Sequence, residues 1–545
     1  MLGIARRMLA SRKAVEFDPE GMPAKLRRSR GAALILSAHR PGHEPLIAVA
    51  SDGTLFEQLR QATDGLKATG KLRALPAFRL KVDLVESMER VVPGGPQPEV
   101  GLEGLWLESG ERRLVLPPSE ALRLGLGSGQ AFVAHALERF GGERVEVRRF
   151  TATSFMERQP GGFGRVVELY RGMPLVERVN ARRLRAAAVA AGDWLLRCQK
   201  PDGTFHYRYE PVRDAFAEGD YSATRHAGVA LALAQLWRAS GQERFGRGAY
   251  RALEWLAARV KSRGPASWVE FRGEATLGAS ALGLLALVEY RRVASTGRFD
   301  KLIRGLCRTV LRLQRPDGFF WSHLDAGSGK GYLPRGEVPL FAPGEAFLAL
   351  ATLRGLWPEA VGKEPLRRAA DFWAQRRDKW YEDRDLGMIV ADSWSLAALD
   401  ELHRLGLAAR PHLDYCFFLA EQILARQETP ATARWRDHVG APIEHGQAPE
   451  TGTTAACCEG LGAAWRLARR MGTLAARYRR GALLAARFVL WHQFDRVNSY
   501  LVRNPGRALG SFFSSYAKQA IRMDEVQHAI SALLGVAELL EAEEP

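Results

Sequence analysis

From about residue 170 onward, apolar positions recur every three to four residues in long segments, the pattern of amphipathic α-helices. One set of segments is bulky and rich in arginine, and its members span about 179–199, 244–260, 299–314, 363–377, 411–427 and 473–494. Each is followed by a segment dense in Ala, Gly, Leu and Ser, and these span 224–237, 278–290, 343–354, 392–403, 454–467 and 527–540. Because small side chains let helices approach closely, we expect the second set to form a crowded inner ring and the first set an outer ring.

The connections between these segments alternate in length. Those from an inner to an outer segment are short, as at RASGQE and RVASTGR, whereas those from an outer to an inner segment are long, as from Gln314 to Pro343 and from Phe494 to Gln527. Loops longer than about 12–15 residues in a compact domain are usually functional. Since all the long loops fall on the same side of the helical hairpins, the sequence predicts a mostly α fold, an (α/α)6 toroid over residues 170–545, with a funnel where the inner helices begin.

Residues 31–160 have a different pattern, in which β-rich runs alternate with helical stretches at about 55–67 and 128–140. The β-rich runs lie at 32–38, 45–50, 78–86, 113–117 and 144–150. This alternation predicts a smaller α+β domain in front of the toroid. Residues 1–30 form a basic N-terminal arm, which we interpret as a solvated tail rather than as a contact for nucleic acid or lipid.

Composition narrows the classes of partner. The chain has 545 residues, and 78 Lys and Arg against 61 Asp and Glu give a net charge of +17, spread thinly and without the basic and aromatic stripe of a nucleic-acid-binding surface. No apolar run approaches the roughly 18–20 residues that span a bilayer, and the start of the chain has no apolar signal-peptide core. Five cysteines are too few for a disulfide framework. The sequence therefore predicts a cytoplasmic protein with no transmembrane segment.

One short element is repeated directly after two outer segments: QKPDGTF begins at Gln199 and QRPDGFF begins at Gln314. Pro and Gly end the helix, Asp forms the turn, and the aromatic ring packs under the next loop. This element resembles one found in six-hairpin glycosidases and in terpenoid cyclases, which are both α/α toroids. The resemblance implies that architecture and a structural role for these aspartates. Similarity to six-hairpin enzymes also implies glycoside hydrolysis, sugar epimerisation or uronate elimination.

The segment GLEGLWLESGERRLVLPPSEA, which begins at Gly101, is followed by a helical stretch and the run RVEVRRFTATSF. It resembles the second half of the AMMECR-type domain, which also has a glycine-led strand, a Leu-Pro turn, a helix and a closing strand. The Gly-Cys-Ile-Gly signature of that family is missing, since the chain has no cysteine before Cys198. The resemblance therefore implies a fold for residues 31–160 and no settled activity.

Titratable side chains stand at or near the start of the inner segments, where they would face the funnel close to the positive end of a helix. The predicted acid/base set is Glu345, Asp392, Glu459 and His528. The predicted substrate-binding set is Tyr221, Arg225, His226, Trp321, Trp394, Tyr500, Arg522 and Asp524. Taken singly, Asp392 fits a helix N-cap and His226 a hydrogen-bonded core histidine. Carboxylates that converge on one cavity repel one another, which raises the pKa of at least one and provides a general acid near neutral pH.

Carboxylates beside aromatic rings suit a sugar, because the rings stack on the apolar face of a pyranose while carboxylates and arginines hold its hydroxyls. Glycoside hydrolysis requires one protonated acid and one ionised carboxylate. Epimerisation or uronate elimination requires a base that removes a carbon-bound proton. The sequence predicts a carbohydrate-processing enzyme that uses one of these routes on a carbohydrate or other small polar substrate, without a cofactor, and it does not decide between them.

Two other functions remain open. The toroid could be a non-catalytic ligand-binding or scaffold module, since fold does not imply function. It could also be a zinc enzyme similar to lanthionine cyclases or protein prenyltransferases, because Cys457, Cys458 and His528 stand near the starts of neighbouring inner segments.

Overall fold

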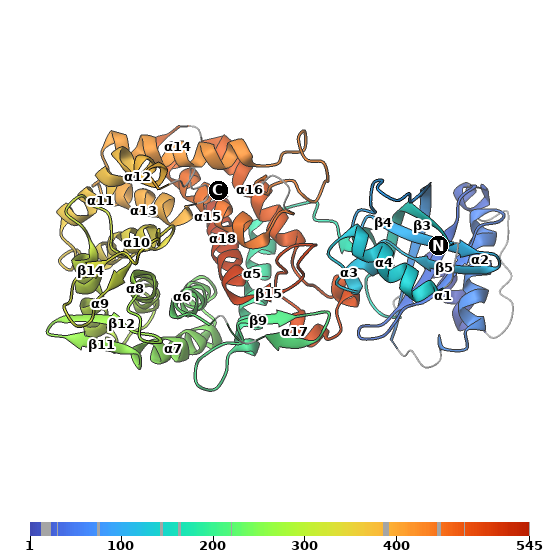
Figure 1. Cartoon of the computed structure of the whole chain (residues 1–545), viewed down its shortest axis with the longest axis horizontal. Coiled ribbons are helices and arrows are strands. Elements are labelled where there is room, and N and C mark those ends of the chain that lie inside the picture. The colour runs from blue at the N-terminus through green and yellow to red at the C-terminus, as the bar shows by residue number, and fades with distance from the viewer. Residues whose placement is uncertain are drawn as a thin grey trace.

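A computed structural model of the chain describes residues 1–11, 23–29, 31–72, 77–141, 145–161, 165–217, 219, 221–384, 392–443, 448–473 and 475–543. Figure 1 shows a small sheet-based domain at the N-terminal end and a larger ring of helices beside it.

In the described residues up to Pro174, an antiparallel eight-stranded sheet forms the N-terminal domain, with main strand order β2-β1-β3-β6-β4-β5, β7 beside β6, and β8 beside β7. The strands are β1 (Leu34–His39), β2 (Leu46–Ala50), β3 (Arg79–Arg90), β4 (Glu103–Ser109), β5 (Arg112–Leu116), β6 (Glu146–Glu157), β7 (Val166–Tyr170) and β8 (Met173–Pro174). The helices are α1 (Leu2–Ala10), η1 (Ala24–Arg27), α2 (Leu55–Ala68), α3 (Glu120–Arg123) and α4 (Gly129–Phe140). The sheet therefore reaches past residue 160, where the sequence pattern placed the end of this domain.

The start of the chain is packed rather than free. Helix α1 buries Leu2, Ala5 and Met8 and lies against α2 and β3. Arg6 forms an ion pair with Glu157 at the end of β6. An apolar stripe along one side of a short helix gives it a face to bury, so this part of the predicted arm is not a solvated tail. Residues 12–22 and 30 of the arm lie outside the described residues.

The remainder of the described chain forms a double ring of helical hairpins. The outer helices are α5 (Ala181–Cys198), α7 (Glu243–Ala257), α9 (Asp300–Leu313), α11 (Lys363–Gln375), α14 (Arg410–Arg426) and α16 (Ala475–Trp491). The inner helices are α6 (Ala223–Ser240), α8 (Leu277–Arg291), α10 (Ala342–Leu356), α13 (Ser393–Arg404), α15 (Thr451–Met471) and α18 (Met523–Glu541). Each inner helix packs on the next one, and α18 packs on both α15 and α6, which closes the ring (Figure 1). The predicted (α/α)6 toroid is confirmed.

Short elements occupy the connections. They are β9 (Arg208–Glu210), β10 (Ala215–Ala217), β11 (Val260–Arg263), β12 (Ala266–Val269), β13 (His323–Leu324), β14 (Gly331–Tyr332), α12 (Arg377–Glu382), η3 (Asn498–Leu501), α17 (Pro505–Ala508) and β15 (Ile521–Arg522). Strand β9 pairs with both β10 and β15, so the first and last hairpins of the ring share one small sheet. This pairing fixes the chain directly before α18 against the connection between α5 and α6.

The predicted element after the outer helices proves to be a clamp between neighbouring outer helices. The side-chain amide at the end of one outer helix donates to a carbonyl of the next: Gln199 to Gly248, Gln314 to Pro365, Gln427 to Gly481 and Gln493 to Ala187, at 2.9, 2.8, 2.9 and 2.9 Å. A glycine with φ between 89° and 103° follows each glutamine at Gly203, Gly318, Gly440 and Gly510. At each, an added Cβ would lie 2.0 to 2.4 Å from a carbonyl oxygen of the same next helix, so only glycine fits.

Buried polar contacts join the two domains. Arg79 of β3 donates to the carbonyls of Arg496 and Val497 at 2.6 and 2.7 Å. Tyr500, which the sequence analysis placed in the substrate-binding set, lies at this junction with 2% exposure, and its hydroxyl donates to the carbonyl of Gly172. That prediction is corrected, because the first part of the long loop before α18 serves domain docking and not the funnel.

Candidate functional site

Side chains from neighbouring inner helices meet inside the ring. His528 of α18 and Glu459 of α15 form a pair, with 3.0 Å between imidazole Nδ1 and carboxylate Oε2. The same carboxylate oxygen accepts a hydrogen bond from Ser393 Oγ at the start of α13. The ring of Trp394 lies 5.6 Å from the imidazole, centre to centre, and is tilted by 57°. The carboxylate and the indole together fix the orientation of the imidazole, which is 23% exposed.

Glu345 lies in the first turn of α10, directly after Pro343 and Gly344, and is buried. Its Oε2 has no hydrogen-bond partner among the described residues. A Cβ added to Gly278 of α8 would lie 3.1 Å from this oxygen, so the glycine makes room for the carboxyl. Burial raises the pKa of Glu345 to about 8; His528 opposes this shift and Asp392 adds to it. The carboxyl is therefore protonated at neutral pH.

The surroundings of Glu345 favour its neutral form, whereas those of His528 favour the charged form of the imidazole. Burial by itself would lower the pKa of His528, but Glu459, with smaller contributions from Asp524 and Glu345, raises that pKa above its usual value. A hydrogen-bonded imidazole–carboxyl pair thus stands beside a carboxylic acid that is protonated at neutral pH. With Nδ1 bound to Glu459, Nε2 is the nitrogen that can exchange a proton with a ligand. The structure thus brings together three of the four residues of the predicted acid/base set, Glu345, Glu459 and His528.

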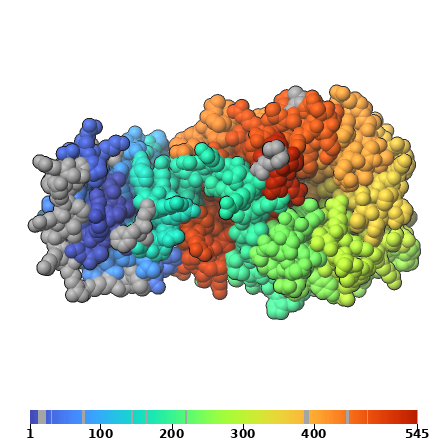
Figure 2. Space-filling model, turned by 180° about the vertical axis from the view of Figure 1, so that it is seen from behind, coloured from blue at the N-terminus to red at the C-terminus, as the bar shows by residue number. Residues whose placement is uncertain are grey.

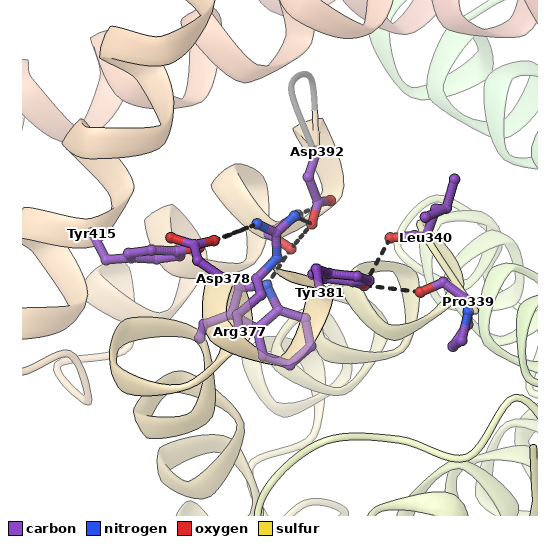
Figure 3. A network of polar contacts seen from close by, with 9 residues as sticks. Pro339, Leu340, Arg377, Asp378, Tyr381, Asp392 and Tyr415 are labelled. Atoms are coloured by element: carbon purple, nitrogen blue, oxygen red, sulfur yellow. Dashed lines mark hydrogen bonds and ion pairs between the residues drawn. The ribbon is translucent and has the colours of Figure 1, made fainter. Parts of the chain in front are cut away.

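Asp392, the fourth predicted acid, has other partners (Figure 3). Its Oδ1 accepts from the backbone N–H of Ser395 at 3.1 Å, which caps α13, and its Oδ2 accepts from Arg377 at 2.8 Å. Arg377 is 1% exposed and also donates to the hydroxyl of Tyr415. The structure therefore places Asp392 in a helix cap and a buried ion pair. Sequence reasoning missed Arg377, because one arginine in an arginine-rich segment gives no signal.

Several predicted binding residues do meet at the mouth of the ring. Arg522 donates to both oxygens of Asp524 at 3.1 and 2.6 Å, and Arg225 of α6 approaches the same carboxylate at 3.3 Å. Both guanidinium groups lie over the ring of Tyr207. Asp524 precedes His528 by four residues on α18, about one turn or 6 Å along the axis. The mouth and the acid/base residues therefore lie on one face of the same helix.

His226 is a core residue. It has no exposed surface, its Nε2 donates to the carbonyl of Ala252 at 2.8 Å, and its Nδ1 accepts from the hydroxyl of Tyr221 at 2.6 Å. Burial lowers its pKa to about 4, so the ring is neutral. The predicted contact of His226 with substrate is therefore corrected: it positions Tyr221, which also accepts from the backbone N–H of Phe205.

The two tryptophans of the predicted substrate-binding set lie in different parts of the ring. Trp394 lies beside the imidazole, as described above. Trp321 lies in the loop between α9 and α10, with the guanidinium of Arg315 4.7 Å above its ring and Gly331 packed against it. In the part of the chain that the structure describes, no hydrogen bond or ring contact joins Trp321 to the acid/base residues.

Two cavities lie near these residues: one at the mouth of the ring, and one lined in part by Glu459 and Trp394. The mouth cavity, of about 470 Å³, is lined by Tyr207, Arg208, Gly219, Tyr221, Arg225, Arg272 and Arg522. The axial cavity, of about 240 Å³, begins at Glu459 and Trp394 and runs past Gly462, Ser531 and Gly535 toward Arg238 and Glu538 near the ends of the inner helices. Figure 2 shows the surface hollowed between the red end of α18 and the yellow and green helices opposite. The sequence analysis predicted an opening only where the inner helices begin.

The zinc alternative required thiols that face His528. All five cysteines are buried. The thiol of Cys458 instead donates to the carbonyl of Ala482 on α16, and burial raises its pKa, which disfavours the thiolate that binds metal. Among the described residues, no group of three or more His, Cys, Asp or Glu side chains is arranged to hold a metal ion. In the same residues, no helix has the length and apolarity to cross a membrane.

Comparison with known proteins gives the following. No protein-family model and no curated protein matches the chain. A D-mannose isomerase structure is similar, with 11% identity and a TM-score of 0.48, over 65% of this chain and 97% of that chain. A cellobiose 2-epimerase from Spirochaeta thermophila is similar, with 16% identity and a TM-score of 0.48, over 66% and 98%. An uncharacterized protein from Pyrococcus horikoshii has 20% identity and a TM-score of 0.26, over 32% and 95%. Similarity at identities this low does not show what this protein does.

Proposed function

We propose that the ring is a carbohydrate-processing enzyme in which Glu345 acts as the acid and His528, oriented by Glu459, acts as the base. The observation that carries this proposal is the convergence of Glu345, Glu459 and His528 from three inner helices, with the Trp394 ring beside the imidazole. A protonated carboxyl and an oriented imidazole with a raised pKa are the pair that proton transfer near neutral pH requires.

The reaction that this pair supports best is isomerisation or epimerisation of a sugar next to its carbonyl group. His528 Nε2 removes the proton from C2, the C2–H electron pair forms the C1=C2 bond, and the carbonyl oxygen takes the proton of Glu345, which gives an enediol. Protonation of C2 on its opposite face, with the O1–H proton passing back to Glu345, gives the epimer. Protonation of C1, with the O2–H proton passing to Glu345, gives the isomer. The indole of Trp394 offers an apolar wall beside the imidazole, and the mouth residues can hold hydroxyl groups.

Glycoside hydrolysis is the second candidate, and the raised pKa of Glu345 favours it. A protonated carboxyl can protonate a leaving oxygen, and Glu459 would supply the second carboxyl group that this reaction requires. In this reaction, however, Glu459 would have to act while it pairs with His528, which is why isomerisation or epimerisation is preferred.

A deuterium experiment separates these possibilities. The full chain is incubated in D2O with mannose, glucose, fructose and cellobiose, and deuterium at C2 and reducing-end release are followed by NMR. We expect exchange at C2, and we expect H528N to lower its rate at least about 100-fold. E364Q, an exposed carboxylate in the first turn of α11, is the matched control and should leave the rate unchanged. Release of sugar without exchange would establish hydrolysis instead. Absence of both signals would mean that the ring is a binding module and not an enzyme.

The pH profile tests the role of Glu459 as a positioning residue. The active form needs neutral His528 and protonated Glu345, so the rate should rise through the raised pKa of His528 and fall near pH 8. Because Glu459 raises the pKa of His528, E459Q should move the rising limb to lower pH and reduce kcat about 10- to 100-fold. A rising limb that stays in place would mean that Glu459 does not set the charge of the imidazole.

Two further predictions from the sequence concern the N-terminal domain and the cellular compartment. The resemblance of residues 31–160 to the AMMECR-type domain remains a proposal about fold. The cytoplasm remains the predicted compartment, and it rests on the small number of cysteines.

A further inference from the structure

We infer that the substrate carries an anionic group, a carboxylate or a phosphate, and that this group binds in the mouth cavity among Arg208, Arg225, Arg272 and Arg522. This inference deepens the proposed function and rests on it. A guanidinium group can donate two parallel hydrogen bonds to the oxygens of a carboxylate or a phosphate. Arginine is therefore the residue best suited to bind these anions. These four arginines share one cavity although the local structure does not favour the positions of three of them.

Two of the arginines are held directly opposite each other. Strands β9 and β15 pair so that Arg208 faces Arg522 across the ladder, and both line the mouth cavity. Cβ atoms of directly opposed residues lie about 4.5–5.5 Å apart, and like charges in these positions destabilise a sheet. An anion bound between the guanidinium groups would turn this repulsion into attraction.

A third arginine occupies a backbone position that suits glycine or asparagine. Arg272 and Gly273 form the tip of a tight turn, with φ of 55° and 82°, closed by backbone hydrogen bonds between Phe271 and Glu274 in both directions. Left-handed backbone costs a non-glycine residue free energy, and such residues gather at functional sites. Arg272 has no ion pair in the described residues, although its side chain lines the mouth cavity.

The neighbouring carboxylates only partly balance these arginines. Asp524 is shared by Arg225 and Arg522, and Glu210 pairs with Arg208 at 2.7 Å. Glu525 lies 3.6 Å from Arg522; burial raises its pKa to about 7, so at neutral pH it carries only part of a charge. The starts of the long helices α6 and α18 add positive dipole ends. Among the described residues, the mouth cavity is therefore left with a positive excess at neutral pH.

The distance along α18 places this anion on the reacting sugar or on the next one. Arg522 and Asp524 precede His528 by six and four residues, which corresponds to about 6–9 Å along the helix axis. A charge bound in the mouth cavity thus orients a sugar whose carbon atoms reach the imidazole.

Binding to the full chain tests the inference, with glucuronate, glucose 6-phosphate and glucose as probes in titration calorimetry at low salt. We expect glucuronate or glucose 6-phosphate to bind at least about tenfold more tightly than glucose. The anion that binds more tightly identifies the group as a carboxylate or a phosphate. R272G should weaken this binding about tenfold while Tm stays the same or rises by a few degrees, because glycine relieves the turn. R304Q, an exposed arginine on α9, is the control and should change neither quantity.

Two results would overturn the inference: glucose binding as tightly as both anionic sugars, or R272G binding the anionic sugars as tightly as the parent chain. Both are distinct from failure of the proposed function. An enzyme that exchanges C2 deuterium on neutral sugars but shows no preference for anions keeps its function and loses the anion site. A chain that binds anionic sugars through Arg272 without any exchange keeps the anion site and loses the catalytic role.

Discussion

Replacement of Glu345 by glutamine is expected to abolish most turnover and, at the same time, to stabilise the fold at alkaline pH. The carboxyl is buried, its Oε2 has no partner in the described residues, and burial raises its pKa to about 8. Glutamine keeps the shape and cannot donate a titratable proton, so the C2 exchange rate should fall about 100- to 10,000-fold.

The effect on stability has a definite sign. An unfolded chain releases the Glu345 proton near pH 4.5, whereas the folded protein retains it up to about pH 8. Between these values the unfolded state binds fewer protons, so the free energy of unfolding falls by about 1.4 kcal/mol for each pH unit. This contribution is fully present below pH 4.5 and is lost as pH rises through 8. E345Q removes the slope, and the unpaired amide offsets part of the gain, which leaves about 3 kcal/mol of extra stability at pH 8.

Urea unfolding at pH 5, 6.5 and 8 measures both quantities, because ΔG is compared at constant m. E364Q serves again as the control, since the carboxylate that it replaces is exposed. If E345Q kept the full pH dependence of the parent protein, the buried acid would have to be another group, and Glu345 would lose its role as the proton donor.

The ring was predictable because its signals are local and repeated. The small-residue segments at 278–290 and 343–354 match α8 and α10 within two residues at each end, since helices buried on all sides leave an unbroken run of Ala, Gly and Leu. Only two of the four copies of the clamp could be recognised from the sequence. Its first two copies place glycine four residues after glutamine, but Gly440 and Gly510 come much later in their loops, so spacing alone could not identify them.

The site was predictable as a set but not residue by residue. Position at or near the start of an inner segment selected Glu345, Glu459 and His528, and the closed ring brings these side chains together. The same rule also selected His226, whose side chain turns to the outer helix α7 and the carbonyl of Ala252. A helical period fixes the face of a residue but not which neighbour satisfies its polar atoms, and that depends on contacts between distant segments.

The largest loss of stability is expected at Arg377, which the sequence did not single out. R377M removes the cation and leaves the buried carboxylate of Asp392 with hydrogen bonds only from the backbone N–H and the hydroxyl of Ser395. Breaking a buried pair in this way costs about 3–5 kcal/mol. Burial works against the charged guanidinium, but Asp392 and the phenols of Tyr415 and Tyr381 raise the pKa of Arg377, so the ion is held by its partners. Because Asp392 begins the helix that carries Trp394, substrate turnover should fall along with stability.

A double-mutant cycle shows whether the loss belongs to the pair. D392N keeps an oxygen for the cap at Ser395 and removes the charge, so alone it should cost less than R377M. In R377M/D392N no buried charge remains unpaired, so the double variant should be more stable than R377M itself, with a coupling energy of about 1–3 kcal/mol in urea unfolding. D378N, at a half-exposed carboxylate that contacts the same guanidinium, is the matched control and should cost about 1 kcal/mol or less. Additive losses would mean that Arg377 stabilises the fold through packing of its side chain, and that Asp392 is free of it to take part in proton transfer with Glu345.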